Sequence, residues 1–304
     1  MTILAESPPC KNSTGDEKTG GGADRARALR ERITDHVDAL AKAVDDVRAS
    51  ESFRVFLDVQ ARFHRYSWGN TILIATQRPD ATRVAGYKAW EKLGRHVRKG
   101  EHGIMIFAPH KFTRERERDN GESETVDGIG FHVTHVFDVG QTDGEALPTV
   151  DVPTVDALAD DLLAKLIGVA GRRSIKVEFG AFREGFFGAS KRGSVEIANT
   201  YATGQQAKTL AHELAHETLH WNAEGSFTRS AAELEAEAVA YVVCRHFGLD
   251  VELRASRYIA LWGGDSAALR ESLERIATTA RGIIDDADSD ASAERAPQGQ
   301  GVAA

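Results

Sequence analysis

The residues best suited to chemistry lie in the segment HELAH, from His212 to His216. On a helix, histidines four positions apart lie on one face with Cβ atoms about 5–6 Å apart, so both imidazoles can bind one ion. Glu213 follows the first histidine, about 100° further around the helix, where its carboxylate can reach a metal-bound water without binding the metal itself. The spacing therefore predicts a zinc site of the HExxH type, with Glu213 as the general base.

A third protein ligand must come from another element, because two histidines leave a tetrahedral zinc site incomplete. We expect Glu233, 17 residues after His216, to supply it from a second helix. Glu237 lies one turn further along the same face and should accept a hydrogen bond from a ligand histidine. Ser230 and Glu233 also fit a capping box, in which Glu233 would only satisfy the Ser230 amide, so both roles remain open.

The other polar residues near the motif have structural interpretations. Glu235 lies about 200° around the helix from Glu233 and is expected to be a solvated charge. His220 continues the four-residue spacing, but the helix drifts by about 40° per step, so this ring should pass beyond the ion. The metzincin pattern requires Gly and His where Leu219 and Asn222 stand, which excludes that subclass.

The elements that must position these residues can be predicted from periodicity and from breaker residues. In the C-terminal half the sequence predicts a small sheet among helices, with strands at Ile175–Phe179 and Ser194–Ile197 and helices at Val155–Val169, Ala207–His220, Ser230–Phe247 and Ser266–Ile284. In the N-terminal half it predicts helices at Ala23–Ser50, Ser52–His64, Asn70–Gln77 and Gly86–Leu93, a strand at Gly103–Ala108, and a hairpin formed by Lys111–Arg118 and Ile129–Val139.

These elements predict an α+β protein of two domains. A helical N-terminal domain with a small sheet should precede a mostly helical, zincin-like domain that carries the HExxH helix. The stretch 141–154 contains two prolines and little periodicity, as expected for a linker. The expected organisation is a disordered tail at 1–24, a basic domain at 25–140, the linker at 141–154, the zincin-like domain at 155–284 and a second disordered tail at 285–304.

Composition limits the classes of protein that remain. Hydrophobic residues make up 41% of the 304 residues, and no apolar run reaches the roughly 18 residues of a membrane span. The N-terminal segment lacks the pattern of a secretory signal, so a cytoplasmic location is expected. Cys10 and Cys244 form neither a disulfide framework nor a CxxC site. Any metal must therefore be bound by histidine and carboxylate, a ligand set that favours zinc and permits manganese.

Charge is distributed unevenly along the chain. The formal net charge is -8, but residues 52–118 hold 14 Lys and Arg against 6 Asp and Glu. The stretch Arg62–Pro109 interleaves these cations with aromatic residues, a mixture typical of single-stranded DNA binding, in which cations follow phosphates and aromatic rings stack on bases. Core aromatic residues on a solvated basic face would give the same pattern. The expected DNA-binding residues are Arg65, Tyr66, Trp68, Trp90, Arg95, Arg98 and Lys99.

Two resemblances extend this interpretation. The segments HELAHETLH, from His212, and ELEAEAVAY, from Glu233, resemble the zinc-peptidase domain of the ImmA/IrrE metallopeptidases over about residues 175–248. In that family the glutamate that matches Glu233 is the third zinc ligand. The segments YSWGNTILIATQRPDAT, VAGYKAW and LGRHVRKGEHGIMIFAP resemble the N-terminal domain of ArdC-type antirestriction proteins, and the resemblance covers about residues 25–250 in matching order.

The second resemblance implies a single-stranded DNA-binding domain joined to a zincin-like domain, and a protein that protects incoming plasmid or phage DNA from host restriction. An alternative function is a regulatory metallopeptidase that cleaves a repressor or stress regulator as its protein substrate. In a third interpretation, zinc only stabilises the fold.

Overall fold

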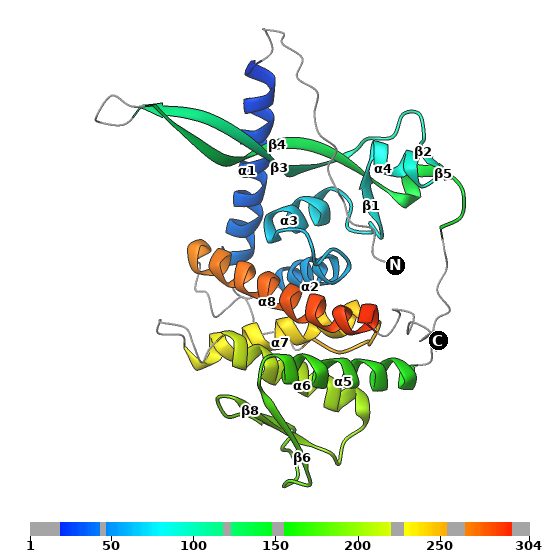
Figure 1. Cartoon of the computed structure of the whole chain (residues 1–304), viewed down its shortest axis with the longest axis vertical. Coiled ribbons are helices and arrows are strands. Elements are labelled where there is room, and N and C mark those ends of the chain that lie inside the picture. The colour runs from blue at the N-terminus through cyan, green and yellow to red at the C-terminus, as the bar shows by residue number, and fades with distance from the viewer. Residues whose placement is uncertain are drawn as a thin grey trace, which may run out of the picture. The chain divides into compact units, whose positions relative to one another are not determined.

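The structure is a computed structural model, which describes residues 19–42, 47–117, 123–147, 155–219, 228–253 and 265–293. The chain divides into two compact units (Figure 1). Unit 1 comprises Met1–His36 and Gly69–Pro148, and unit 2 comprises Val37–Trp68 and Thr149–Ala304. The predicted two-part architecture of helices and sheets is confirmed. No helix among the described residues combines the length and apolarity that crossing a bilayer requires.

The first helices differ from the prediction. The two helices expected at 23–50 and 52–64 correspond to α1 (Thr19–Lys42) and α2 (Val47–Arg62), and the first helix ends and the second begins earlier than predicted. Helix α2 buries Phe53, Phe56 and Leu57 and packs against α7 (Arg229–His246) of unit 2. Residues 37–68 therefore belong to the same unit as the HExxH motif, whereas the sequence placed them in the N-terminal domain.

Unit 1 is built on a long antiparallel hairpin. Strands β3 (Ile104–Glu117) and β4 (Ser123–Asp138) pair in register from Ile104 with Val136 to Glu117 with Ser123, and β1 (Val84–Gly86) pairs on the other side of β4. The predicted hairpin is confirmed, but its first arm is one strand that continues through Pro109. Proline is tolerated there because β3 is an edge strand of this sheet.

The free edge of β3 is covered by two amide side chains of α3 (Trp68–Gln77). Asn70 donates to the Phe107 carbonyl at 2.8 Å and accepts from its amide at 2.9 Å. Gln77 does the same with Met105, at 2.9 and 3.0 Å. Each side chain thus replaces one peptide unit of a missing strand, which satisfies edge groups that would otherwise be open to pairing with another chain.

A second, two-stranded sheet completes unit 1. Helix α4 (Tyr87–Lys92) is followed by β2 (Arg95–Val97), which pairs with β5 (Thr142–Gly144). A 3-10 turn, η1 (Val139–Gln141), connects β4 to β5. The linker predicted from residue 141 is therefore wrong over its first residues, because 141–144 belong to this ordered element, and residues 148–154 lie outside the described residues.

Unit 2 contains four further helices and a small sheet. The helices are α5 (Val155–Arg172), α6 (Thr203–Leu219), α7 and α8 (Ser266–Ala293). The sheet has the order β6 (Lys176–Gly180), β8 (Ser194–Ala198) and β7 (Gly188–Ser190). Strand β6 is parallel to β8, and β7 is antiparallel to it. The three-residue strand β7 was not predicted, because so short a segment carries no periodicity.

Both expected tails are shorter than predicted. Helix α1 begins at Thr19, within the tail expected at 1–24, and α8 continues to Ala293, into the tail expected at 285–304. Ile283, Ile284 and Ala287 of α8 are fully buried, so packing extends the helix into the acidic segment. Residues 1–18 and 294–304 lie outside the described residues.

The expectation that Glu235 is a solvated charge is wrong. Its side chain is fully buried, and Arg275 of α8 donates to both carboxylate oxygens, with Nη2 to Oε1 at 2.6 Å and Nε to Oε2 at 3.1 Å. The face of α7 opposite Glu233 packs against α8 rather than facing water. An ion pair thus joins α7 to α8 in the interior of unit 2.

We predict that Arg275→Leu lowers the free energy of unfolding by about 3–5 kcal/mol, because it removes the cation that compensates a fully buried carboxylate. Glu235→Leu should cost less, because the remaining guanidinium is 27% exposed and can reach water. Urea denaturation of both variants and of the double replacement tests this. A double variant less stable than Arg275→Leu would contradict it.

Candidate metal centre

The HExxH motif lies within helix α6. The helix buries a stripe of small and aliphatic residues, among them Leu210, Ala211 and Leu214, against the rest of unit 2. His212 and His216 flank this stripe and are partly exposed, with side-chain exposures of 19% and 15%. Their ring centroids are 4.7 Å apart with an interplanar angle of 75°. Both imidazoles are therefore available on one face of the helix, as the four-residue spacing predicts.

Glu233 of α7 meets both rings. Its Oε2 lies 3.4 Å from His212 Nε2 and 3.6 Å from His216 Nε2, and the two Nε2 atoms are 3.1 Å apart. A tetrahedral ion with ligand bonds of 2.0–2.1 Å requires ligand atoms about 3.3 Å apart. The three measured separations lie close to this value, so the three atoms form one face of a tetrahedron of the size that zinc requires.

Glu233 does not take part in a capping box with Ser230. Helix α7 begins at Arg229 with Thr228 as its N-cap, and the Thr228 hydroxyl accepts from the Ala231 amide at 3.2 Å. Ser230 lies inside the helix and cannot be the cap. The Glu233 carboxylate lies against His212 instead, and this hydrogen bond is the main reason why its pKa is lowered to about 2.

Glu237 lies on the other side of the His212 ring. Its Oε2 is 3.6 Å from His212 Nδ1, and its Oε1 accepts from Lys208 Nζ at 2.7 Å. A proton on Nδ1 directed at this carboxylate leaves the Nε2 lone pair facing His216 and Glu233, which is the tautomer that metal binding requires. Glu237 is thus placed for the supporting role expected from the sequence.

The centre has a strongly negative local potential. Burial lowers the pKa of His212, but the carboxylates of Glu233 and Glu237 outweigh it, with help from Glu213, and raise that pKa to about 9. A site that favours the imidazolium this strongly also favours other cations at the same position. The ligand types, their separations and this potential all suit a divalent ion.

Glu213 points to a different neighbour, the edge strand β7. It is 7% exposed, and burial raises its pKa above the ordinary glutamate value, although the Ser190 backbone amide, a donor to this carboxylate, acts in the opposite direction. A carboxylate with a raised pKa, held beside the ligands, has the properties of a general base that later returns its proton.

Sequence reasoning missed Glu217, the residue that joins α6 to the sheet. It is buried and accepts from the Ser190 hydroxyl and, at 2.7 Å, from the Gly193 amide. Ser190 therefore bonds two carboxylates of α6, one turn apart. The partners come from a turn and a three-residue strand, so no motif could have indicated them. His220 lies outside the described residues.

The predicted DNA-binding residues are divided between the two units. Arg65, Tyr66 and Trp68 belong to unit 2, and the other four belong to unit 1. Trp90 is 2% exposed, and its indole donates to the Phe137 carbonyl at 2.8 Å. Its prediction as a base-stacking residue is wrong, because helix α4 turns the ring into the core of unit 1.

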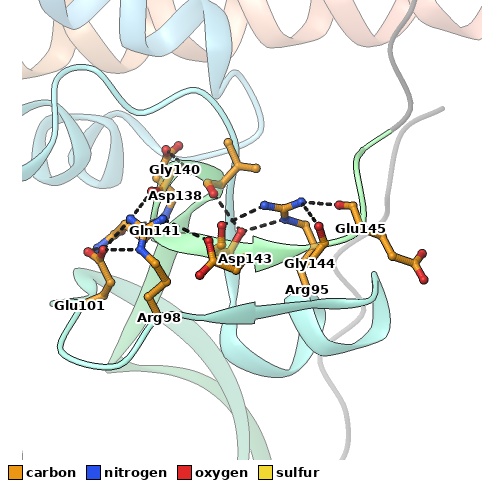
Figure 2. Close-up of polar contacts among 11 residues, drawn as sticks. Arg95, Arg98, Glu101, Asp138, Gly140, Gln141, Asp143, Gly144 and Glu145 are labelled. Carbon is orange, nitrogen blue, oxygen red and sulfur yellow. Dashed lines mark hydrogen bonds and ion pairs between the residues drawn. The ribbon is translucent and has the colours of Figure 1, made fainter.

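Two of the predicted arginines are held by acceptors of the β2–β5 sheet (Figure 2). Arg95 donates to the Thr142 hydroxyl at 2.8 Å and carbonyl at 2.9 Å, and to the carbonyls of Gly144 and Glu145. Arg98 donates to Glu101 at 2.7 Å and to the Gly140 carbonyl at 2.6 Å, and lies 3.5 Å from Asp143. These guanidiniums stabilise the sheet. Lys99, the next residue, is exposed.

Three exposed apolar residues of unit 1 lie on the β3–β4 hairpin. Phe112 is 39% exposed, Ile129 66% and Phe131 59%, and exposed Lys111 pairs with Ile129. The Phe112 ring lies over Gly128 of the opposite strand, where a Cβ would approach it to 2.6 Å. Glycine at this position thus makes room for the ring beside the strand. Sequence reasoning missed these residues because the basic and aromatic stretch that it used for DNA binding, Arg62–Pro109, ends before them.

Comparisons with known proteins agree with the resemblance to ArdC-type antirestriction proteins in the N-terminal part of the chain. Residues 27–137 match the sequence profile of the N-terminal domain of anti-restriction factor ArdC. A curated but uncharacterised protein of Bacillus anthracis is 27% identical over 272 residues, which cover 75% of this chain and 46% of that protein. The chain therefore spans less than half the length of this relative.

Two similar solved structures are those of the antirestriction protein ArdC from plasmid R388, one metal-free and one with Mn(II) bound. Both are 19% identical to this chain, with TM-scores of 0.47 and 0.46. They match 82% and 81% of this chain and 98% of theirs. The profile match confirms the ArdC-type resemblance over residues 27–137, which are similar to the N-terminal domain of anti-restriction factor ArdC.

Proposed function

We propose that this protein is a single-stranded DNA-binding antirestriction protein that protects incoming mobile-element DNA and has a metallopeptidase-type centre in unit 2. The observation that carries the metal assignment is the triangle of His212, His216 and Glu233, whose separations of 3.1, 3.4 and 3.6 Å suit one tetrahedral ion. Zinc is the preferred ion for two histidines and a carboxylate, and manganese is the alternative.

The surrounding residues have separate roles in this proposal. A bound ion would supply Lewis-acid activation of a water and of a carbonyl oxygen. Glu213 accepts the proton of that water, and its raised pKa lets it return the proton to a leaving group. Glu237 holds the His212 ring through Nδ1, and Lys208 holds Glu237. Ser190 positions Glu213 relative to β7.

For DNA, we assign the interface to the β3–β4 hairpin of unit 1. Phe112 and Phe131 offer exposed rings, and a base can stack on each because every base has an aromatic face. Lys111 pairs with Ile129, so it lies on the same face of the hairpin as Phe131 and offers a cation for the phosphate backbone there, whereas Phe112 lies on the opposite face. This assignment replaces Trp90, Arg95 and Arg98, which are occupied by contacts within unit 1.

A second candidate function is that of a regulatory metallopeptidase that cleaves a repressor or stress regulator. The observation that favours it is the placement of Glu213 between the candidate ligands and β7, an edge strand. An extended peptide can add to such an edge by backbone hydrogen bonds, which would place its carbonyl groups beside the proposed ion.

We predict that Glu233→Gln weakens zinc binding by more than about 10-fold, because a neutral amide replaces a charged carboxylate ligand. Glu271→Gln of α8, an exposed carboxylate with the same chemical change, is the control and should bind zinc like the wild type. Competition with a chelator of known affinity measures both. Equal affinity in the two variants would rule out Glu233 as a ligand.

Glu213→Gln separates catalysis from a stabilising role of the metal. If the centre is catalytic, this variant retains zinc and thermal stability but hydrolyses protein substrates more slowly. The expected loss of rate is about 10²–10⁴-fold, the usual contribution of a general base. The measurement is the rate at which each protein cleaves candidate repressors or stress regulators. The metal content of both proteins is determined in parallel. Hydrolysis at the wild-type rate would exclude Glu213 as the base.

The hairpin assignment predicts that Phe112→Ala and Phe131→Ala each weaken oligothymidine binding by about 1–3 kcal/mol, the cost of losing one stacked base. Phe179→Ala is the matched control, because its ring is 40% exposed, like that of Phe112, but lies in unit 2. Fluorescence anisotropy at several salt concentrations gives the affinities. Weakening by the control as large as by the hairpin variants would place the interface elsewhere.

A further inference from the structure

A second group of metal-binding side chains lies in unit 2, formed by residues from other segments. His64, His246 and Asp288 each offer one ligand atom, and these atoms all lie within 4.8 Å of one another. His64 follows the end of α2, His246 is the last residue of α7, and Asp288 lies near the end of α8. Three helix ends thus converge on one point.

The two imidazoles of this cluster are arranged like those of the HExxH motif. Their ring centroids are 4.5 Å apart with an interplanar angle of 75°, compared with 4.7 Å and 75° for His212 and His216. The same relative placement is reached here by residues from different helices. The geometry that allows two rings to share an ion therefore does not depend on the four-residue spacing.

His246 is held in the tautomer that a ligand needs. Its Nδ1 lies 2.8 Å from the carbonyl oxygen of Ala61. A carbonyl only accepts hydrogen bonds, so the proton is on Nδ1 and the Nε2 lone pair is free to bind a cation. Ligand histidines commonly show this arrangement, in which a backbone carbonyl fixes the ring by the nitrogen that does not bind the metal.

His64 is buried without a hydrogen bond. The residue is 8% exposed, and neither ring nitrogen has a hydrogen-bond partner among the described residues. Leaving a buried polar group without a hydrogen bond destabilises the folded state. Burial, helped by His246, Arg65 and Arg281, lowers the pKa of His64 to about 3, so the ring is neutral. A neutral imidazole with a lone pair directed into a protein interior can bind a metal ion.

The charges around the cluster permit a cation. Asp285, one turn before Asp288, has its Oδ1 3.5 Å from His64 Nε2, a separation that also suits two ligands of one ion. Two cations are nearby: Arg65 lies 3.7 Å from the same carboxylate, and Arg281 donates to the carbonyls of His64 and Tyr66. Asp285 thus faces Arg65, whereas Arg281 is bound to backbone oxygens.

We propose that His64, His246 and Asp288 form a second divalent-cation site, separate from the HExxH centre, with Asp285 as a fourth ligand or as a hydrogen-bond partner of the site. Two imidazoles and carboxylate select zinc over magnesium or calcium. An ion at this position would join the ends of α2, α7 and α8. With Asp285 as the fourth ligand the site is closed by protein ligands and leaves no position for a substrate, so its role is to stabilise unit 2.

The test uses the full chain in which His212→Ala and His216→Ala remove the HExxH site. Equilibrium dialysis against buffered zinc, followed by metal analysis, should find two bound ions per chain in the wild type and one in this double variant. Zinc should also raise the melting temperature of the double variant. Circular dichroism verifies that it is folded. If it does not fold, the zinc stoichiometry of the wild type decides alone, and saturation at one ion would overturn the proposal.

In the same background, Asp288→Asn should weaken the remaining zinc site by at least about 10-fold, because a charged ligand becomes a neutral amide. Glu274→Gln, an exposed carboxylate of the same helix, is the matched control and should change nothing. A folded double variant that binds no zinc, or one whose zinc affinity is the same with and without Asp288→Asn, would show that the cluster is not a metal site.

Discussion

The account of unit 2 depends on the convergence of two imidazoles of α6 and one carboxylate of α7. The two Nε2 atoms lie only 3.1 Å apart, and a cation bound between them and the carboxylate would satisfy both lone pairs. The structure holds Glu233 within 3.4 and 3.6 Å of the two ring nitrogens while leaving it half exposed. Packing between the helices, rather than the polar contact itself, must therefore fix this geometry.

That packing is secured by charged groups inside unit 2. Glu235 and Glu233 lie on different faces of α7, and the buried pair of Glu235 with Arg275 fixes the rotation of α7 against α8. On α6, Glu217 fixes the helix against the β7–β8 turn through Ser190 and Gly193. A few carboxylates thus set the orientation of the two helices, and the candidate ligands take their positions from that orientation.

Local patterns in the sequence were sufficient to predict much of the candidate metal site. Helical period and the HExxH spacing predicted α6, and a 17-residue separation pointed to Glu233, which the structure brings to the rings. What could not be predicted depends on distant partners. Arg95 and Arg98 each have a partner in β5 that lies more than 40 residues away, and His64 and His246 meet only after α2 packs on α7. Trp90 was misjudged because the short α4 has too few residues to show which face is buried.

Metal binding and DNA binding are assigned to different units, so each can be removed without the other. The claim on which the chemistry depends is that one divalent ion is bound by His212, His216 and Glu233. Anomalous diffraction at the zinc edge, from crystals grown with zinc, tests it most directly. The account predicts a peak about 2.0–2.2 Å from both Nε2 atoms and from a Glu233 oxygen. Density without an anomalous peak there, or a peak that Glu233 does not reach, would contradict it.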